Sequence, residues 1–219
     1  MTLNNLGTVA QDQRDDLRAL KLFGEALEIA KETGDRNRIA LILTNLGETH
    51  NRLGAAAAAV TYLRQAEELA EELGDKLSLA EALRGLGKAY LAQREFVKAR
   101  NATQRAVDLF GEIESKVQLG VALRALGEVT AATPAASTGD LRAAAEHLRK
   151  SIAIFEEIGN EVELARSCQS YSDLLRATPE HAQNPAIARE AHALATRAAE
   201  IVERLKHGAA GQRGAAVTH

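Results

Sequence analysis

The feature that most constrains this chain is a pair of residues that recurs every forty positions. The pairs are Leu6-Gly7, Leu46-Gly47, Leu86-Gly87 and Leu126-Gly127, and Tyr171-Ser172 continues the series five residues late. Self-similarity at a fixed period of this length is typical of supersecondary units stacked in an array. The sequence therefore predicts a repeat protein and sets the fold before any other property is considered.

A second landmark follows each pair and indicates that every unit contains two helices. It reads Ala, three residues, an apolar residue, two residues, a small residue, and it begins at Ala19, Ala59, Ala99, Ala144 and Ala191. Between residues 35 and 73, apolar residues keep helical spacing on both sides of an interruption at Gly54. The pattern therefore predicts an all-α chain of paired helices.

The boundaries between units are marked by a Gly followed by a capping residue. Gly34, Gly74 and Gly159 suit the left-handed residue that ends a helix. Asp35, Asp75, Ser115 and Asn160 suit the N-cap of the next helix. The predicted units are approximately 1–34, 35–74, 75–114, 115–159 and 160–207 within one repeat domain over residues 1–207, and residues 208–219 are predicted to be a flexible tail.

These two landmarks resemble the tetratricopeptide repeat family, which pairs Leu-Gly-x2-Tyr on a first helix with Ala-x3-Phe-x2-Ala on a second. Leu86–Tyr90 ("LGKAY"), with Ala99 and Ala106, is the best match. The resemblance implies a right-handed solenoid of about five antiparallel helix pairs, with a groove lined by the first helices. The period of forty exceeds the common thirty-four, and this form with Gly-Asp turns resembles the variant in G-protein regulators and bacterial multidomain signalling regulators. HEAT repeats, which lack both landmarks, are the structural alternative.

Composition excludes several classes of function. The net charge of −3 gives no basic stripe for direct nucleic-acid binding, and no apolar run is long enough for a membrane span. Cys168 is the single cysteine, so an internal disulfide is excluded and a cytoplasmic location is expected. No catalytic or metal-binding signature is present, and we expect neither an enzyme nor a cofactor. Gly85–Lys88 ("GLGK") lacks the phosphate-loop pattern, and its Gly87 is the glycine of a Leu-Gly pair, equivalent to Gly7.

The start of the chain predicts a second feature. Met1 falls partway along the first helix that the repeat pattern requires. We therefore expect the chain to be a segment of a longer protein, or its N-terminal end to pack on an upstream domain or on a second copy, because terminal units normally carry a polar outer face.

The resemblance places a partner protein or peptide in the groove of the first helices. The residues expected to bind it are Asn45, Glu48, Asn51, Arg52, Arg84, Lys88, Arg124 and Gln169. Amides can bond a peptide backbone and Arg can hold a carboxylate, so an acidic segment is the expected ligand. The competing interpretation is a surface whose charges only neutralise one another in water.

The predicted function is a protein–protein interaction scaffold. Two alternatives remain open: a regulatory or sensor segment of a larger signalling or transcription regulator, and a self-assembly module. An undetected enzyme is the weakest alternative, because a repeat array offers no closed pocket by default.

Overall fold

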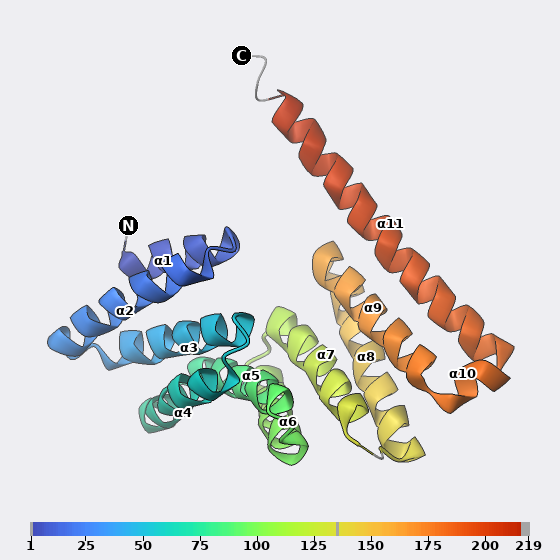
Figure 1. The fold of residues 1–219 in the computed structure, drawn as a ribbon, viewed down its shortest axis with the longest axis horizontal. Helices are drawn as coiled ribbons and strands as arrows, with labels where there is room; N and C mark the ends of the chain where they lie inside the picture. The colour runs from blue at the N-terminus through green and yellow to red at the C-terminus, as the bar shows by residue number, and fades with distance from the viewer. Residues whose placement is uncertain (1, 135, 216–219) are drawn as a thin grey trace. The chain divides into compact units, whose positions relative to one another are not determined.

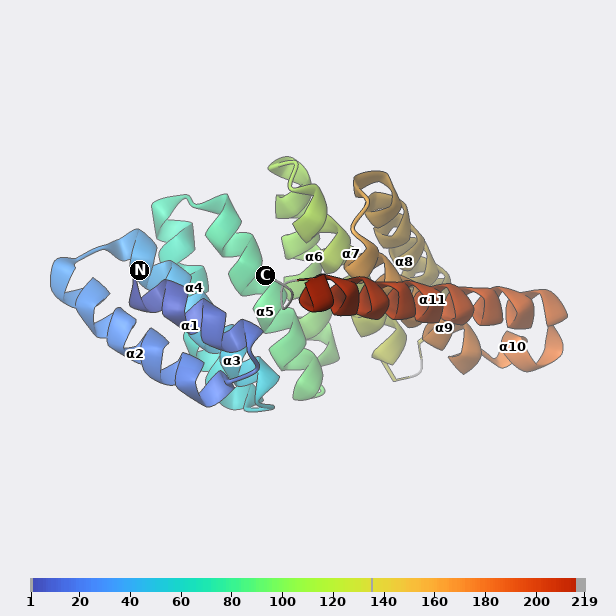
Figure 2. The same cartoon turned by 90° about the horizontal axis from the view of Figure 1, so that it is seen from above.

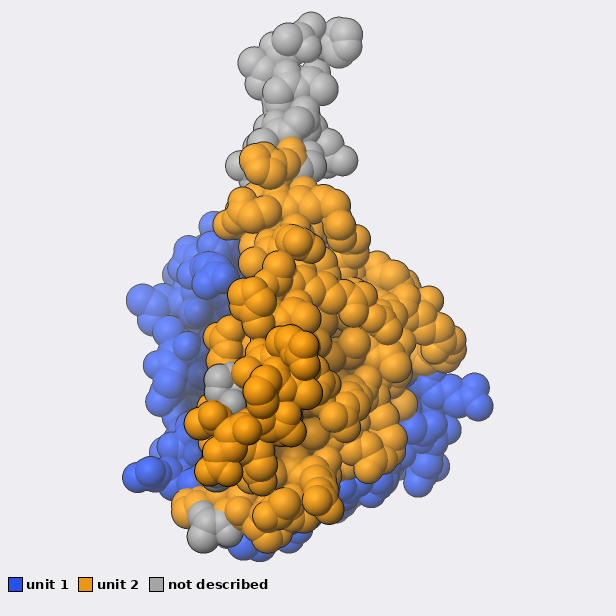
Figure 3. Space-filling model, turned by 90° about the vertical axis from the view of Figure 1, so that its right-hand side faces the viewer, with its two compact units in different colours: residues 1–115 blue, residues 116–219 orange. Residues whose placement is uncertain are grey.

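The computed structural model describes residues 2–134 and 136–215, and the elements formed by these residues are α-helices (Figure 1). The chain divides into two compact units, residues 1–115 and residues 116–219, coloured blue and orange in Figure 3. We describe each unit by itself. The prediction of an all-α chain is confirmed, whereas one repeat domain over residues 1–207 stays a prediction.

Unit 1 consists of three helix pairs. Its helices are α1 (Leu3–Asp12), α2 (Asp16–Thr33), α3 (Arg36–Arg52), α4 (Ala56–Leu73), α5 (Lys76–Ala92) and α6 (Phe96–Glu112). Each odd-numbered helix packs against the even-numbered helix that follows it, and α3 and α5 also pack on the pair before them. Short turns join consecutive helices, which therefore run antiparallel (Figure 1, Figure 2).

Unit 2 contains α7 (Lys116–Ala132), α8 (Thr138–Ile158), α9 (Glu161–Ala177), the short α10 (Pro179–Gln183) and α11 (Pro185–Ala215). Helices α7 and α8 form one pair, α9 packs on α8, and α11 packs on α9. Asn184 caps α11 by accepting a hydrogen bond from the Ala186 amide at 2.9 Å. Helix α11 continues to Ala215, beyond residue 208 where the sequence predicts a tail; flexibility of the tail stays a prediction, and residues 216–219 lie outside the described residues.

The turns between successive helix pairs have the predicted glycine and capping residues. Gly34 and Gly74 end α2 and α4 with φ of 68° and 67°. Asp35 and Asp75 then cap the next helices by accepting hydrogen bonds from backbone amides. Glu114 holds the position equivalent to Gly34 and Gly74, and it adopts the same left-handed backbone with φ of 53°. The backbone geometry is therefore repeated even where the glycine is not.

The glycine of each Leu-Gly pair allows two helices to approach closely. A Cβ atom added to Gly7 would lie 2.5 Å from Phe23, and one added to Gly127 would lie 2.7 Å from Leu148. No side chain fits at such distances, so glycine is required by packing in the fully folded pair. Gly47, facing Leu63, has the same role.

The two layers of unit 1 differ in spacing, and this difference defines an inner face. The first helices α1, α3 and α5 contact one another along the stack. Among the described residues the backbones of the second helices α2, α4 and α6 do not approach one another in this way, and α6 reaches α4 through the long side chain of Arg105, which pairs with Glu67 and Glu71. A stack curves toward its tighter layer, so α1, α3 and α5 form the inner face of unit 1.

Two local features of unit 2 follow from capping and burial. Helix α8 begins at Thr138 and includes Gly139, because Ser137 and Asp140 form a reciprocal capping box. Cys168 is fully buried, and burial raises the pKa of its thiol.

Candidate partner-binding face

The centre of the inner face of unit 1 is an ion-pair network around Arg84. Its guanidinium donates to Glu81 at 2.8 Å on the same helix and to Glu48 of α3 at 3.4 Å. Burial alone would lower the pKa of the Arg84 guanidinium, but the carboxylates of Glu48 and Glu81 outweigh burial and raise it. Arg84 is therefore a permanent cation whose charge is balanced by two neighbouring carboxylates.

The two predicted amide ligands of this face join helices to each other. Asn45 donates to the Asn4 side chain of α1 at 3.0 Å. Asn51 donates to the backbone carbonyl of Gly85 in α5 at 2.9 Å. These bonds run along the stack of first helices, so both side chains set the spacing between neighbouring helix pairs of unit 1.

Arg52 lies at the end of α3 and binds the preceding helix pair, α1 and α2. It donates to Asp16 at 2.7 Å and to the backbone carbonyl of Gln11 at 3.0 Å. Its guanidinium therefore holds the turn between α1 and α2 against α3. A partner could reach Arg52 only by competing with these two acceptors.

Lys88 differs from the other predicted residues of unit 1. It is exposed on α5, one turn after Arg84, and it makes no ion pair with any residue that the structure describes. An exposed ammonium keeps its hydration and can exchange it for a carboxylate of a ligand. Lys88 is thus the available cation of the inner face.

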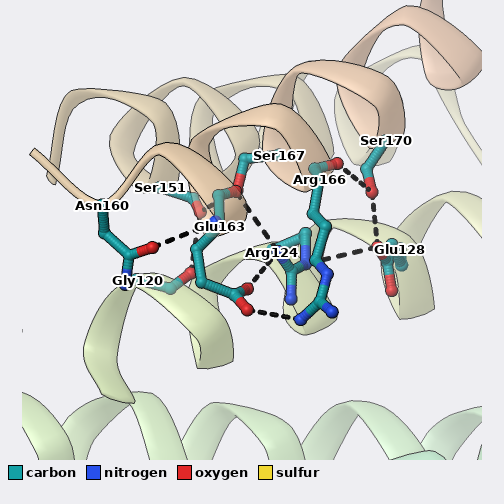
Figure 4. Close-up of polar contacts among 9 residues, drawn as sticks. All are labelled: Gly120, Arg124, Glu128, Ser151, Asn160, Glu163, Arg166, Ser167 and Ser170. Atoms are coloured by element: carbon teal, nitrogen blue, oxygen red, sulfur yellow. Dashed lines mark hydrogen bonds and ion pairs between the residues drawn. The ribbon is translucent and has the colours of Figure 1, made fainter. Parts of the chain in front are cut away.

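Unit 2 holds Arg124 in a second network (Figure 4). Arg124 of α7 lies 2.7 Å from Glu163 Oε2 of α9 and 3.8 Å from Glu128 of its own helix. The Arg124 and Glu163 side chains are only 13% and 14% exposed, and Glu163 also pairs with Arg166. This network links α7 to α9, as Arg84 links α5 to α3.

Gln169, the last predicted ligand, is exposed on α9. Its amide donates to Asp173 one turn later at 2.8 Å. On the same face, Ser170 donates to Glu128 of α7 at 2.6 Å (Figure 4). The structure thus places Asn45, Glu48, Asn51, Arg52, Arg84 and Lys88 in unit 1, where a contact joins Glu48 to Arg84, and it places Arg124 and Gln169 in unit 2.

Sequence reasoning missed the carboxylates that neutralise the arginines. Glu81 and Glu163 do not hold the repeat positions from which the binding residues are predicted, although each lies three residues before an arginine of the same helix. It also missed three cross-helix pairs that recur between the start of a first helix and the end of its second helix, namely Arg36–Glu72, Lys76–Glu112 and Lys116–Glu157. The signal was present as a basic residue directly after each capping residue.

Two searches of the described residues bear on function. None of their helices combines the length and apolar character needed to cross a membrane. Over the same residues, no group of three or more acidic, His or Cys side chains could hold a metal ion.

Comparison with known proteins identifies the helix pairs. The family model of the tetratricopeptide repeat matches residues 1–72 and 38–112, which together cover half of the chain. The chain belongs to the tetratricopeptide repeat family. This fold is typical of protein–protein interaction scaffolds, and the family is generally non-enzymatic.

Solved structures of the same fold share little sequence with this tetratricopeptide repeat protein. BtubC from P. vanneervenii has a TM-score of 0.73 at 18% identity, with 93% of this chain and 80% of that chain covered. Rap protein complexed with Competence and Sporulation Factor has a TM-score of 0.76 at 16% identity, with 92% and 54% covered. Aspartyl phosphate phosphatase F from Bacillus subtilis has a TM-score of 0.65 at 15% identity, with 94% and 58% covered. A search of curated proteins found no match.

Proposed function

We propose that the inner face of unit 1 binds an acidic segment of a partner protein and that the chain acts as a scaffold without catalytic activity. The observation that carries the proposal is Lys88, an exposed cation that pairs with none of the described residues and lies one turn from Arg84, whose own charge is balanced by Glu48 and Glu81. A ligand carboxylate would gain a charge-assisted hydrogen bond there. The Rap structure, which holds Competence and Sporulation Factor, supports the proposal at the level of the fold.

The network around Arg84 would position Lys88 and provide a second contact. Arg84 is three-quarters buried and shared between Glu48 and Glu81, so its side chain is already ordered before a ligand arrives. A ligand that binds beside it would lose less conformational entropy in ordering the site. Substituting Arg84 by Glu would place three carboxylates together and disturb the packing of α3 and α5. Lys88 is therefore the cleaner residue for testing binding.

The proposal is tested first by locating the binding face. A photo-crosslinking residue is introduced at Thr8 on the inner face of α1 or at Glu68 on the exposed side of α4, and the captured proteins are identified from the native host extract. We expect a specific protein to be captured from position 8 and not from position 68. Equal capture from both positions would contradict an inner-face site.

The second test measures affinity for that captured protein. We expect Lys88→Glu to weaken binding by about 10- to 150-fold, because reversing one charge-assisted contact removes about 1.5–3 kcal/mol. Glu68→Lys, an equally large charge change on the other layer, should leave the dissociation constant unchanged. Unchanged affinity in Lys88→Glu would overturn the acidic-ligand proposal.

A second candidate function is that of a regulatory or sensor segment in a larger signalling regulator. The favouring observations are the forty-residue period with Gly-Asp turns, and the Rap structure with its bound factor. This candidate uses the same inner face but requires that ligand binding alter an attached domain. It is distinguished by measuring the activity of the full-length protein with and without the ligand.

A further inference from the structure

The last helix pair carries an apolar groove that is separate from the inner face of unit 1. The groove lies between α9 and α11 and has a volume of about 740 Å³. Its apolar lining includes Val162, Ala165, Ala198, Val202 and Leu205, and its polar lining consists of Arg166, Gln169, Glu203 and Lys206. Val162, Val202 and Leu205 are exposed by 46%, 41% and 37%, so three large apolar side chains meet solvent in one place.

The repeat itself shows what fills this groove elsewhere in the chain. Ala66, Ser151 and Ala198 hold the same position on the second helices of their pairs, and Ala70, Phe155 and Val202 follow four residues later. In unit 1, α5 packs on α4, and Ala66 and Ala70 are fully buried. In unit 2, α9 packs on α8, and Ser151 and Phe155 are fully buried. Val202 is 41% exposed, and no second helix among the described residues covers it in the same way.

A carboxylate one turn beyond the lining residue Gln169 indicates a donor on a helix that would fill the groove. Glu48 and Glu128 hold equivalent positions on α3 and α7, and each accepts a hydrogen bond from the next first helix, from Arg84 and from Ser170 respectively. Asp173 is the equivalent carboxylate on α9, and its hydrogen bond comes from Gln169 of its own helix. A helix seated in the groove would place a basic or hydroxyl side chain beside Asp173.

The floor of the groove sets the size of the incoming side chains. Leu63 of α4 contacts the position of Gly85 so closely that a Cβ there would lie 2.9 Å away. In α11 the equivalent of Leu63 is Ala195, and the alanines of α11 that line the groove are Ala198 and Ala199. Smaller floor residues leave room for apolar side chains larger than those of an internal first helix.

We propose that the groove between α9 and α11 binds one amphipathic helix of a partner protein, with its apolar stripe on Val202 and a basic or hydroxyl side chain facing Asp173. This contact continues the helix stacking already present in the array. It uses residues of unit 2 and does not depend on the ligand proposed for unit 1.

The test uses a synthetic peptide copying α5, residues 76–92, because α5 fills the equivalent groove in unit 1. Its binding to the full chain is measured by fluorescence anisotropy, with amide NMR shifts to locate the contact. We expect saturable binding with shifts on α9 and α11. A peptide carrying Arg84→Glu should bind more weakly, because its carboxylate would face Asp173. Absence of saturable binding, or shifts confined to other helices, would overturn the proposal.

Substitutions in the chain provide the matched controls. We expect Val202→Glu to weaken peptide binding about tenfold, because a buried Val contributes about 1.5 kcal/mol. Val97→Glu, which changes an exposed apolar residue of α6, and Lys88→Glu should not alter it. If light scattering shows a dimer that Val202→Glu dissociates, the occupant is a second copy of this chain and the proposal of a partner helix is wrong.

Discussion

Glu114 has a left-handed backbone that disfavours any side chain, whereas the equivalent turns between the other helix pairs hold glycine. Its φ of 53° is left-handed, whereas Gly34, Gly74 and Gly159 hold the equivalent turns with φ near 68°. A side chain in this region costs about 1–2 kcal/mol because Cβ approaches the following carbonyl oxygen. The turn is kept because both flanking helices require it.

The first prediction follows from this strain. We expect Glu114→Gly to raise the free energy of unfolding by about 1 kcal/mol, since glycine removes the steric cost but loses more entropy on folding. The measurement is urea unfolding followed by circular dichroism. Gly74→Ala, where no atom lies within 4 Å of an added Cβ, is the reverse control and should destabilise the chain through the backbone alone. A less stable Glu114→Gly variant would contradict the argument.

His50 gives a prediction on pH. Its ring stacks on Tyr62 with centroids 5.3 Å apart, its Nδ1 has no hydrogen-bond partner among the described residues, and burial lowers its pKa below 6.5. The unfolded chain therefore binds a proton at this site at higher pH than the folded chain does. The contribution of His50 to stability is complete above pH 6.5 and is lost as the pH falls below that value.

The check compares the wild type with His50→Phe, which keeps an aromatic ring against Tyr62 but does not titrate. Urea unfolding at pH 7.5 and pH 5.5 should show a larger loss on acidification for the wild type. The remaining histidines are common to both proteins and cancel in the difference. Identical losses would show that His50 binds protons equally in both states.

At the scale of the element, close packing of helix pairs depends on residues that carry no charge and no chemistry. Gly47 of α3 faces Leu63 of α4, which is fully buried, and an added Cβ would lie within 3.0 Å of the Leu63 side chain. Glycine is required only at such close crossings, because Gly24 of α2 has nothing within 4 Å of an added Cβ. The helix axes are therefore set by the smallest residue at each crossing.

We predict a coupled pair of substitutions at this crossing. Gly47→Ala should destabilise by about 1–3 kcal/mol through overpacking, and Leu63→Ala by about 2–5 kcal/mol through a cavity. In the double variant the new methyl group enters the cavity, so the loss should fall short of the sum by about 1 kcal/mol. Gly24→Ala should be neutral or stabilising, by up to about 1 kcal/mol. Strict additivity would show that the two residues do not touch.

Ion pairs between elements have two different roles. The recurring pair of Lys76 and Glu112 is more than half exposed on both sides, and such pairs contribute about 0–1 kcal/mol. Arg124 and Glu163 are largely buried, so removing one partner would leave an uncompensated charge. The exposed pairs therefore contribute little to stability, whereas the buried pair links α7 to α9.

At the scale of the whole molecule, the division into two compact units makes a prediction about folding. Unit 1 contains a core of its own that includes Phe23, Leu43 and Ala66, and repeat arrays are stabilised mainly by contacts between neighbours. We expect residues 1–115 expressed alone to give a helical spectrum and a cooperative thermal transition. A fragment without a cooperative transition would show that unit 1 depends on residues 116–219.

The sequence by itself determined the repeat, the helical class and the turn chemistry. Each follows from local rules: Leu-Gly pairs at a fixed period, Gly34 and Gly74 with positive φ, and Asp35 and Asp75 as caps. The candidate binding residues could be placed on a face by the same period. The forty-residue period alone assigns them to one face of the first helices, without tertiary information.

The tertiary structure alone decided which of those residues are available to a ligand. Asn45, Asn51 and Arg52 bond to groups 34 to 41 residues away, and Arg84 is shared between Glu48 and Glu81. Repeat columns give the face of a side chain but not its partner, because the partner depends on the distance between helices. For the same reason the exposed groove beside Val202 is not visible in the sequence, since burial there depends on whether another helix covers it.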